Sequence, residues 1–153
     1  MRFVLFYHSV LSDWNHGNAH FLRGVASELI ARGHRVDIYE PENGWSLENL
    51  LSERGKAPLQ EFAGVYPELT TNSYRIETID LNRVLEGADV VIVHEWNDPE
   101  LIRRVGEAAQ RGLDEDRFAV GPDDLGVALP LAAAGDRLPQ VVVSVRAPPV
   151  SDH

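Results

Sequence analysis

The sequence predicts an α/β protein in which helices cover both faces of a parallel sheet. Two apolar runs, residues 2–7 and 89–94, lack the polar alternation of half-exposed strands and are typical of strands buried on both faces. Segments with helical spacing alternate with strand-like runs through residues 1–112. This alternation predicts a Rossmann-like, doubly wound parallel sheet of about four or five strands; if its strand order is 3-2-1-4, the order reverses between the first and fourth strands.

The first unit is a strand, a helix and a second strand. Apolar side chains recur at helical spacing after residue 17, namely Phe21, Leu22, Val25, Ala26, Leu29 and Ile30. Gly33 supplies a left-handed C-cap, and residues 36–39 mark the second strand. A right-handed crossover between parallel strands is expected for this connection.

Two short helices are predicted next. Ser46 is a suitable N-cap for the first, with Trp45 packing on Leu50 as a hydrophobic staple. Pro58 suits the first position of the second, whose inward side chains would be Leu59, Phe62 and Ala63.

The remaining elements of this part complete the alternation. The third strand is predicted at residues 74–79, and Asp80 caps a short helix at residues 81–85. The strand at 89–94 is followed by a helix that begins at Pro99 and ends at Gly112. Residues 1–112 are therefore expected to form one lobe.

Residues 113–153 have a different pattern. An acidic stretch and an apolar stretch without clean periodicity precede the run QVVVSV at residues 140–145. This part is expected to be an irregular, partly disordered tail with one added strand at 140–145.

Composition excludes several classes of protein. The 153 residues include 24 acidic and 14 basic side chains, a formal net charge of −10, and no basic stripe of the kind that binds nucleic acid. The chain has no cysteine, which rules out disulfides, thiolate nucleophiles and cysteine metal sites. No apolar stretch approaches the roughly 20 residues that span a bilayer, so a cytoplasmic protein is expected.

Two loops are expected to meet where the strand order reverses. In open α/β sheets, ligands bind beyond the carboxyl ends of the strands at this reversal, here between the first and fourth strands. The loops are residues 8–20, HSVLSDWNHGNAH, and residues 94–98, HEWND. Each contains tryptophan for stacking, and asparagine, aspartate and histidine for directed hydrogen bonds.

Candidate site residues follow from these loops. His16 and His94 are the candidate catalytic residues, because both lie beside the reversal among polar neighbours. The candidate substrate-binding residues are Ser12, Asp13, Trp14, Asn15, Gly17, Asn18, His20, Glu95, Trp96 and Asn97.

Structural roles compete with these assignments. Asp98 or Asn97 can simply cap the helix that begins at Pro99, and Asn15 or Asn18 can cap the first helix. His20 can pack against the helix or face water. His34, which begins a strand after a glycine turn, is interpreted as structural.

Neither a metal site nor a cofactor is predicted. His16 and His20 are four residues apart, but the run HGNAH lacks the glutamate of a zinc-protease helix. No G-x-G-x-x-G follows the first strand and no Walker A lysine is present. An anion at the N-terminus of the first helix stays open as a weak alternative.

The ordered set of segments resembles the N-terminal lobe of GT-B glycosyltransferases. The resemblance is carried by MRFVLFYH, by HGNAHFLRGVASELIARGHRVDIYEP with its turn from Gly33 to Val36, and by ADVVIVHEWNDP with its run from Asp89 to His94. It covers about residues 1–111.

This resemblance implies transfer of a sugar from a nucleotide-sugar donor to an acceptor. The N-terminal lobe would hold the acceptor with Ser12 to His20, and His94 with Glu95 would face the cleft. A second lobe would hold the donor, and the chain is too short to contain it, so no sugar transfer is expected without that lobe. A truncated gene product with a frame-shifted tail is the corresponding hypothesis, and translation of the downstream DNA in all frames tests it.

Two other functions stay open. A Rossmann-like module that binds a small ligand or a protein partner without catalysis would explain the short length. A small hydrolase that uses His16 or His94 is weaker, because no nucleophile elbow accompanies these histidines.

Overall fold

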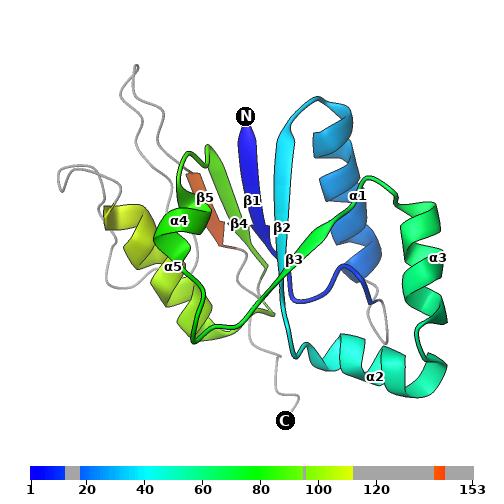
Figure 1. Ribbon diagram of the computed structural model, residues 1–153. Coiled ribbons are helices and arrows are strands. Elements are labelled where there is room, and N and C mark those ends of the chain that lie inside the picture. Colours follow the sequence, from blue (N-terminus) through cyan, green and yellow to red (C-terminus); the bar gives the residue numbers. More distant parts are fainter. Residues whose placement is uncertain (13–17, 95, 112–139, 144–153) are drawn as a thin grey trace, which may run out of the picture.

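The computed structural model describes residues 1–12, 18–94, 96–111 and 140–143 (Figure 1). Its strands are β1 (Arg2–Phe6), β2 (Arg35–Pro41), β3 (Thr71–Tyr74), β4 (Val90–Val93) and β5 (Gln140–Val143). Its helices are α1 (Asn18–Ala31), α2 (Trp45–Arg54), α3 (Ala57–Val65), α4 (Leu81–Leu85) and α5 (Pro99–Arg111). Strands and helices alternate along the chain, which confirms the predicted α/β class.

The sheet is parallel throughout and has the order β3-β2-β1-β4-β5. The first four strands therefore have the order 3-2-1-4, and the reversal lies between β1 and β4. The strand β5 falls within the expected run 140–145 and pairs with β4. The rest of the tail, and the predicted end at Gly112, lie outside the described residues.

Helices cover the sheet on both faces (Figure 1). On one face, side chains of β1 and β4 pack against α4 and α5. On the other, side chains of β1 and β2 pack against α1 and α3. The strand β1 serves both cores because its side chains alternate, with Val4 and Phe6 on the first face and Leu5 on the second.

Several predicted caps are confirmed. Gly33 has φ +78° after α1 and donates its N–H to Ile30 O at 2.8 Å. The Asp80 carboxylate accepts the N–H of Arg83 at 3.2 Å at the start of α4. The Asp98 carboxylate accepts the N–H of Glu100 at 2.8 Å, so Asp98 has a capping role at the start of α5.

The prediction for the third strand is wrong, because this strand spans Thr71–Tyr74 and not residues 74–79. After Tyr74 the chain turns, with the N–H groups of Thr78 and Ile79 both donating to Arg75 O. Ile76 and Ile79 still pack on the core. Their apolar character therefore reflects packing of a turn and not strand alternation.

The predicted start of the second helix is also wrong. Ser46 is not an N-cap: α2 begins at Trp45, and Gly44 occupies the cap position without a side-chain hydrogen bond. Ser46 is 1% exposed, and its hydroxyl donates to Ser12 Oγ at 3.0 Å. In α3, Pro58 lies one position after the first residue, and Ala63 is exposed while Phe62 is buried.

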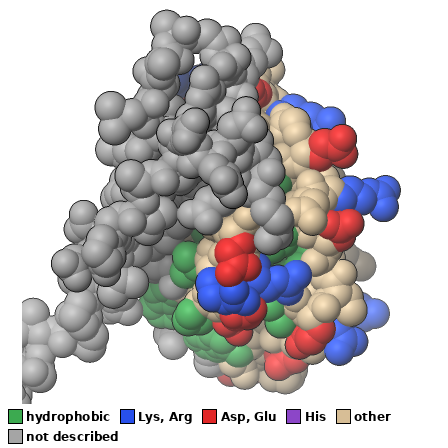
Figure 2. All heavy atoms as spheres, turned by 90° about the vertical axis from the view of Figure 1, so that its left-hand side faces the viewer, with side chains coloured by type: hydrophobic (Ala, Val, Ile, Leu, Met, Phe, Trp, Pro, Cys, Tyr) green, Lys and Arg blue, Asp and Glu red, His purple; other side chains and the backbone are tan. Residues whose placement is uncertain are grey.

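The face seen in Figure 2 carries acidic and basic side chains beside one another on its described part. On α5, Arg103 pairs with Glu100 at 2.5 Å and also with Glu107. Among the described residues, no helix has the length and apolar character needed to cross a membrane.

Candidate functional site

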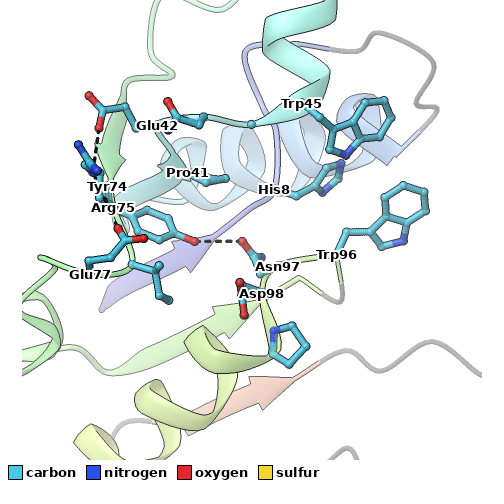
Figure 3. A pocket seen from close by; sticks show the side chains of 14 residues that line it. His8, Pro41, Glu42, Trp45, Tyr74, Arg75, Glu77, Trp96, Asn97 and Asp98 are labelled. Atoms are coloured by element: carbon cyan, nitrogen blue, oxygen red, sulfur yellow. Dashed lines mark hydrogen bonds and ion pairs between the residues drawn. The ribbon is translucent and has the colours of Figure 1, made fainter.

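A cavity of about 590 Å³ opens at the carboxyl-terminal edge of the sheet (Figure 3). It is lined from the segments that follow β1, β2, β3 and β4, by His8, Pro41, Glu42, Asn43, Gly44, Trp45, Tyr74, Arg75, Ile76, Glu77, Trp96, Asn97, Asp98 and Pro99. This edge is where ligands bind in open α/β sheets. The cavity is therefore the candidate site.

The loop that carries His8 is held by a buried carboxylate. Glu40, at the end of β2 and 6% exposed, accepts the backbone N–H groups of Val10 and of Leu11, the latter at 3.1 Å. Burial raises the pKa of Glu40 above its ordinary value, against the lowering effect of these hydrogen bonds and of Arg23. The Arg23 guanidinium donates to Val10 O at 2.7 Å, so the residue Val10 is fixed at both its N–H and its carbonyl.

Three serines fix the next residues of the same loop. Ser9 Oγ donates to Ser12 O at 2.7 Å, and Ser12 N–H donates back to Ser9 Oγ at 3.1 Å. Ser12 Oγ donates to Ser46 O at 2.9 Å, which ties the loop to α2. Because these hydroxyls are buried and hydrogen-bonded, they hold the loop in one conformation.

Two histidines meet at the reversal of the strand order. His8 follows β1 and His94 follows β4, and their Nδ1 atoms lie 3.1 Å apart. His94 Nδ1 also accepts the N–H of Trp96 at 3.4 Å, so we assign His8 as the donor in this pair. In that tautomer Nε2 is the basic nitrogen of neutral His8. The Nδ1 atom of His94 is thus the acceptor of the pair, and the hydrogen bond between the two Nδ1 atoms holds the His8 ring in a defined orientation.

Aromatic side chains surround one end of the cavity. The His8 ring lies 5.5 Å from the Trp96 ring, and Trp45, from the start of α2, lies at the same end of the cavity (Figure 3). Trp45 is 45% exposed and Trp96 is 39% exposed, unusually high values for this side chain. Both indoles are therefore partly exposed at this end of the cavity.

Asn97 holds the turn that presents Trp96. Its side-chain amide donates to Phe6 O at 2.7 Å and to His94 O at 2.8 Å, which links the ends of β1 and β4. Its Oδ1 accepts the hydroxyl of Tyr74 at 3.4 Å. Burial raises the pKa of Tyr74, and the charge of Asp98 raises it further, so the phenol stays protonated at neutral pH.

The other end of the cavity is charged. Arg75 Nε lies 3.8 Å from Glu42 Oε2 and 3.8 Å from Glu77 Oε2, and all three side chains are largely exposed. Asp98 lies on a further wall (Figure 3). Among the described residues, no group of three or more His, Asp or Glu side chains is arranged to hold a metal ion.

The predicted site residues have separate locations. His94, Trp96 and Asn97 lie together at the cavity with His8. Ser12 is fully buried in the serine network, and Asn18 and His20 are exposed on α1, where His20 lines a different cavity of about 220 Å³. The other candidates lie outside the described residues, namely Asp13, Trp14, Asn15, His16, Gly17 and Glu95.

Several lining residues were not predicted from the sequence, namely His8, Trp45, Tyr74, Arg75, Glu42 and Glu77. The rule that ligands bind at carboxyl ends applies equally to β2 and β3. Residues 41–45 follow the second strand and are reached by the same rule, and residues 74–77 would be reached by it with the third strand at Thr71–Tyr74. His8 was within the first loop considered, but nothing in the sequence distinguished it from His16.

Comparisons of the chain with models of protein families, with curated proteins and with solved structures found no match.

Proposed function

We propose that this chain is the acceptor-side lobe of a GT-B-like glycosyltransferase and that the cavity at the sheet edge holds the acceptor sugar. The observation that carries the proposal is the cavity at the strand-order reversal, in which two partly exposed tryptophans, Trp45 and Trp96, lie beside the His8–His94 pair. The resemblance of residues 1–111 to such lobes supports the same function.

The cavity has the chemistry that a sugar ring requires. A pyranose presents a face of C–H groups, which packs on an indole, and a rim of hydroxyls, which need directed hydrogen bonds. Trp45 and Trp96 offer the first kind of contact. Arg75, Glu42 and Glu77 line the same cavity with largely exposed side chains and offer the second. The volume of about 590 Å³ is also in the range of small-ligand sites.

The histidine pair can serve as the base of the transfer. His8 Nε2 is buried in this structure, so a rotation of the ring must expose it; it then takes the proton of the acceptor hydroxyl while the hydroxyl oxygen bonds to the anomeric carbon, and the nucleotide leaves with the electrons of the broken bond. His94 accepts the hydrogen bond from His8 Nδ1 and stabilises the imidazolium that forms. The donor would be held by a second lobe, and the described residues form one sheet only.

Sugar binding is the first experiment. A ligand that binds the folded chain at about ten times its dissociation constant adds about 1.4 kcal/mol to the unfolding free energy, which raises Tm by several degrees. We expect this rise with neutral monosaccharides and oligosaccharides, and we expect Trp96→Ala to abolish it. Phe21→Ala is the matched control, because Phe21 is 69% exposed on α1 and does not line the cavity.

The alternative is a Rossmann-like module that binds a small ligand or a protein without catalysis. The aromatic-lined cavity favours it as well, since binding alone needs no second lobe. A rise in Tm with nucleotides and none with sugars would support this module and contradict an acceptor lobe. Sugar transfer by the purified chain would contradict the need for a separate donor lobe.

A further inference from the structure

We propose that Asn97 is a positioning residue of the histidine pair. Its side-chain amide sets the contact between the Nδ1 atoms of His8 and His94, and this contact determines which nitrogen of each ring carries the proton. The inference rests on the proposed function only for the use of His8 as a base, because the positioning itself can be measured without a sugar.

The side-chain amide of Asn97 joins the ends of two strands. Asn97 is 7% exposed, and its Nδ2 donates to Phe6 O at 2.7 Å and to His94 O at 2.8 Å. A side-chain amide has two N–H protons, so both are used in these hydrogen bonds. Phe6 is the last residue of β1, and His94 directly follows β4. One buried side chain therefore fixes the two strand ends relative to each other at the reversal.

The Tyr74 hydroxyl fixes the orientation of this amide. Tyr74 lies at the end of β3, and its hydroxyl donates to Asn97 Oδ1 at 3.4 Å (Figure 3). If the amide were flipped, Oδ1 would face the carbonyl oxygens of Phe6 and His94, and two hydrogen bonds would be replaced by repulsion. The Asn97 side chain is therefore held in the orientation that donates to both strand ends.

The amide acts on the His94 ring through the backbone. The backbone N–H of Asn97 also donates to His94 O, at 3.0 Å, so the backbone and the side chain of Asn97 bind the same carbonyl. The backbone N–H of His94 donates to Phe6 O at 2.9 Å, and the N–H of Trp96 donates to His94 Nδ1 at 3.4 Å. Loss of the Asn97 amide would therefore loosen the segment that orients the His94 ring.

The loop that carries His8 is anchored on the opposite side of β1. The Glu40 carboxylate, at the end of β2, accepts two backbone N–H groups of this loop. Because β1 lies between β2 and β4, this anchor and the Asn97 amide hold the two histidines from opposite sides. The Nδ1 atoms meet between them at 3.1 Å.

This contact permits one arrangement of protons in the neutral pair. Two ring nitrogens at 3.1 Å can share one proton, whereas two facing N–H groups would repel each other. Since His94 Nδ1 also accepts the Trp96 N–H, the shared proton belongs to His8 Nδ1. A neutral imidazole released from the contact can carry its proton on either nitrogen. The positioning by Asn97 therefore leaves Nε2 as the nitrogen of His8 that can accept a proton.

The test records the imidazole signals of the full chain by NMR after nitrogen isotope labelling, without sugar and at a pH above the ordinary pKa of histidine. The shifts of the ring nitrogens show which of them carries the proton. We expect the proton of His8 on Nδ1 and that of His94 on Nε2. Because a buried, hydrogen-bonded proton exchanges slowly with water, the Nδ1–H signal of His8 should be observable.

Two substitutions of Asn97 test its role. Asn97→Ala removes both donors and adds no bulk, so the Nδ1–H signal of His8 should be lost. The ring nitrogens of both histidines should then shift toward values averaged over two tautomers. Asn97→Ser keeps one hydroxyl donor and is the milder change. It should show the same loss in part, and it keeps the test available if Asn97→Ala does not fold.

Asn72→Ala is the matched control. Asn72 Nδ2 donates to Ile38 O at 3.1 Å, so this amide also joins two strands, but Asn72 does not line the cavity. The control should keep the histidine signals of the unsubstituted chain. A purely structural role of Asn97 would lower the unfolding free energy and leave these signals unchanged in the folded variant.

Three outcomes would overturn the inference: a proton on His94 Nδ1 in the unsubstituted chain, unchanged histidine signals in folded Asn97→Ala, or the same loss of signal in Asn72→Ala. The sugar titration tests the proposed function separately. A chain that binds no sugar while its histidine signals respond as expected would contradict the acceptor site and support the positioning role of Asn97.

Discussion

Glu40 shows how one side chain can position the site without entering it. Its carboxylate accepts two backbone N–H groups of the loop that begins at His8, and it is almost fully buried. The Glu40 carboxylate thus takes the place of water as the hydrogen-bond acceptor of these N–H groups. The stability of the loop is therefore linked to the protonation of one carboxyl group.

This linkage predicts a pH dependence with a definite sign. Because burial raises the folded-state pKa of Glu40 above about 4.5, the folded chain binds more protons than the unfolded chain above that pH. The contribution of Glu40 to the unfolding free energy should therefore fall as pH rises from about 4.5 through the folded-state pKa. Glu40→Gln should lack this fall, as measured by urea unfolding across that range.

Glu68 is the matched control. The Ser27 hydroxyl donates a hydrogen bond to the Glu68 carboxylate at 2.6 Å and lowers the pKa of Glu68. The contribution of Glu68 to the unfolding free energy is therefore present above its unfolded-state pKa and is lost as pH falls through the folded-state pKa. Glu68→Gln should thus change the pH profile in the opposite direction to Glu40→Gln. Profiles that shift in the same direction would contradict the assigned cause.

The turn after α1 sets the path from helix to β2 and depends on a glycine. Gly33 has φ +78°, and a Cβ there would meet no atom within 4 Å, so the conformation alone disfavours other residues. We expect Gly33→Ala to lower the unfolding free energy by about 1 kcal/mol.

Gly24 offers the complementary measurement. It lies within α1 with open space around its Cβ position and an ordinary helical φ, so Gly24→Ala should raise the unfolding free energy by up to about 1 kcal/mol. Equal effects of the two substitutions in urea unfolding would contradict the conformational explanation.

Elements with strong local signals were predictable from the sequence. The apolar runs of β1 and β4, the glycine after α1 and the aspartate before α4 can each be recognised from residues adjacent in the sequence. The third strand and the start of α2 were not, because Ile76 and Ser46 owe their positions to tertiary partners. Ile76 packs on a core formed by residues far away in the sequence, and the Ser46 hydroxyl donates a hydrogen bond to Ser12 in the loop after β1.

At the scale of the whole molecule, the two cores share one central strand. Leu5 is fully buried on the α1 face, and Leu101 is fully buried on the α5 face. We expect Leu5→Ala and Leu101→Ala each to lower the unfolding free energy by about 2–5 kcal/mol. Both variants should keep a single unfolding transition, because damage to either face destabilises β1.

The measurement is urea unfolding followed by circular dichroism and by tryptophan fluorescence. Coincident curves for both variants would support one cooperative unit. Two separated transitions in either variant would show that the faces unfold independently, and would contradict the shared role of β1.

The site itself was only partly predictable. The rule for open sheets located the reversal and selected His94, Trp96 and Asn97, which lie there. It did not identify Trp45 or Tyr74, because their place at the cavity depends on where α2 begins and β3 ends. The sequence also does not show that His8, rather than His16, lies at the site, because that distinction comes from the contact between His8 and His94.

Binding of a sugar to the tryptophan end of the cavity is the central claim, and indole NMR signals test it most directly. On titration with a monosaccharide, the Nε1–H signals assigned to Trp45 and Trp96 should shift together along one saturable curve. The Trp96→Ala variant should lose the saturable shift of Trp45. Signals of both indoles that stay unchanged while the chain remains folded would contradict an acceptor site in this cavity.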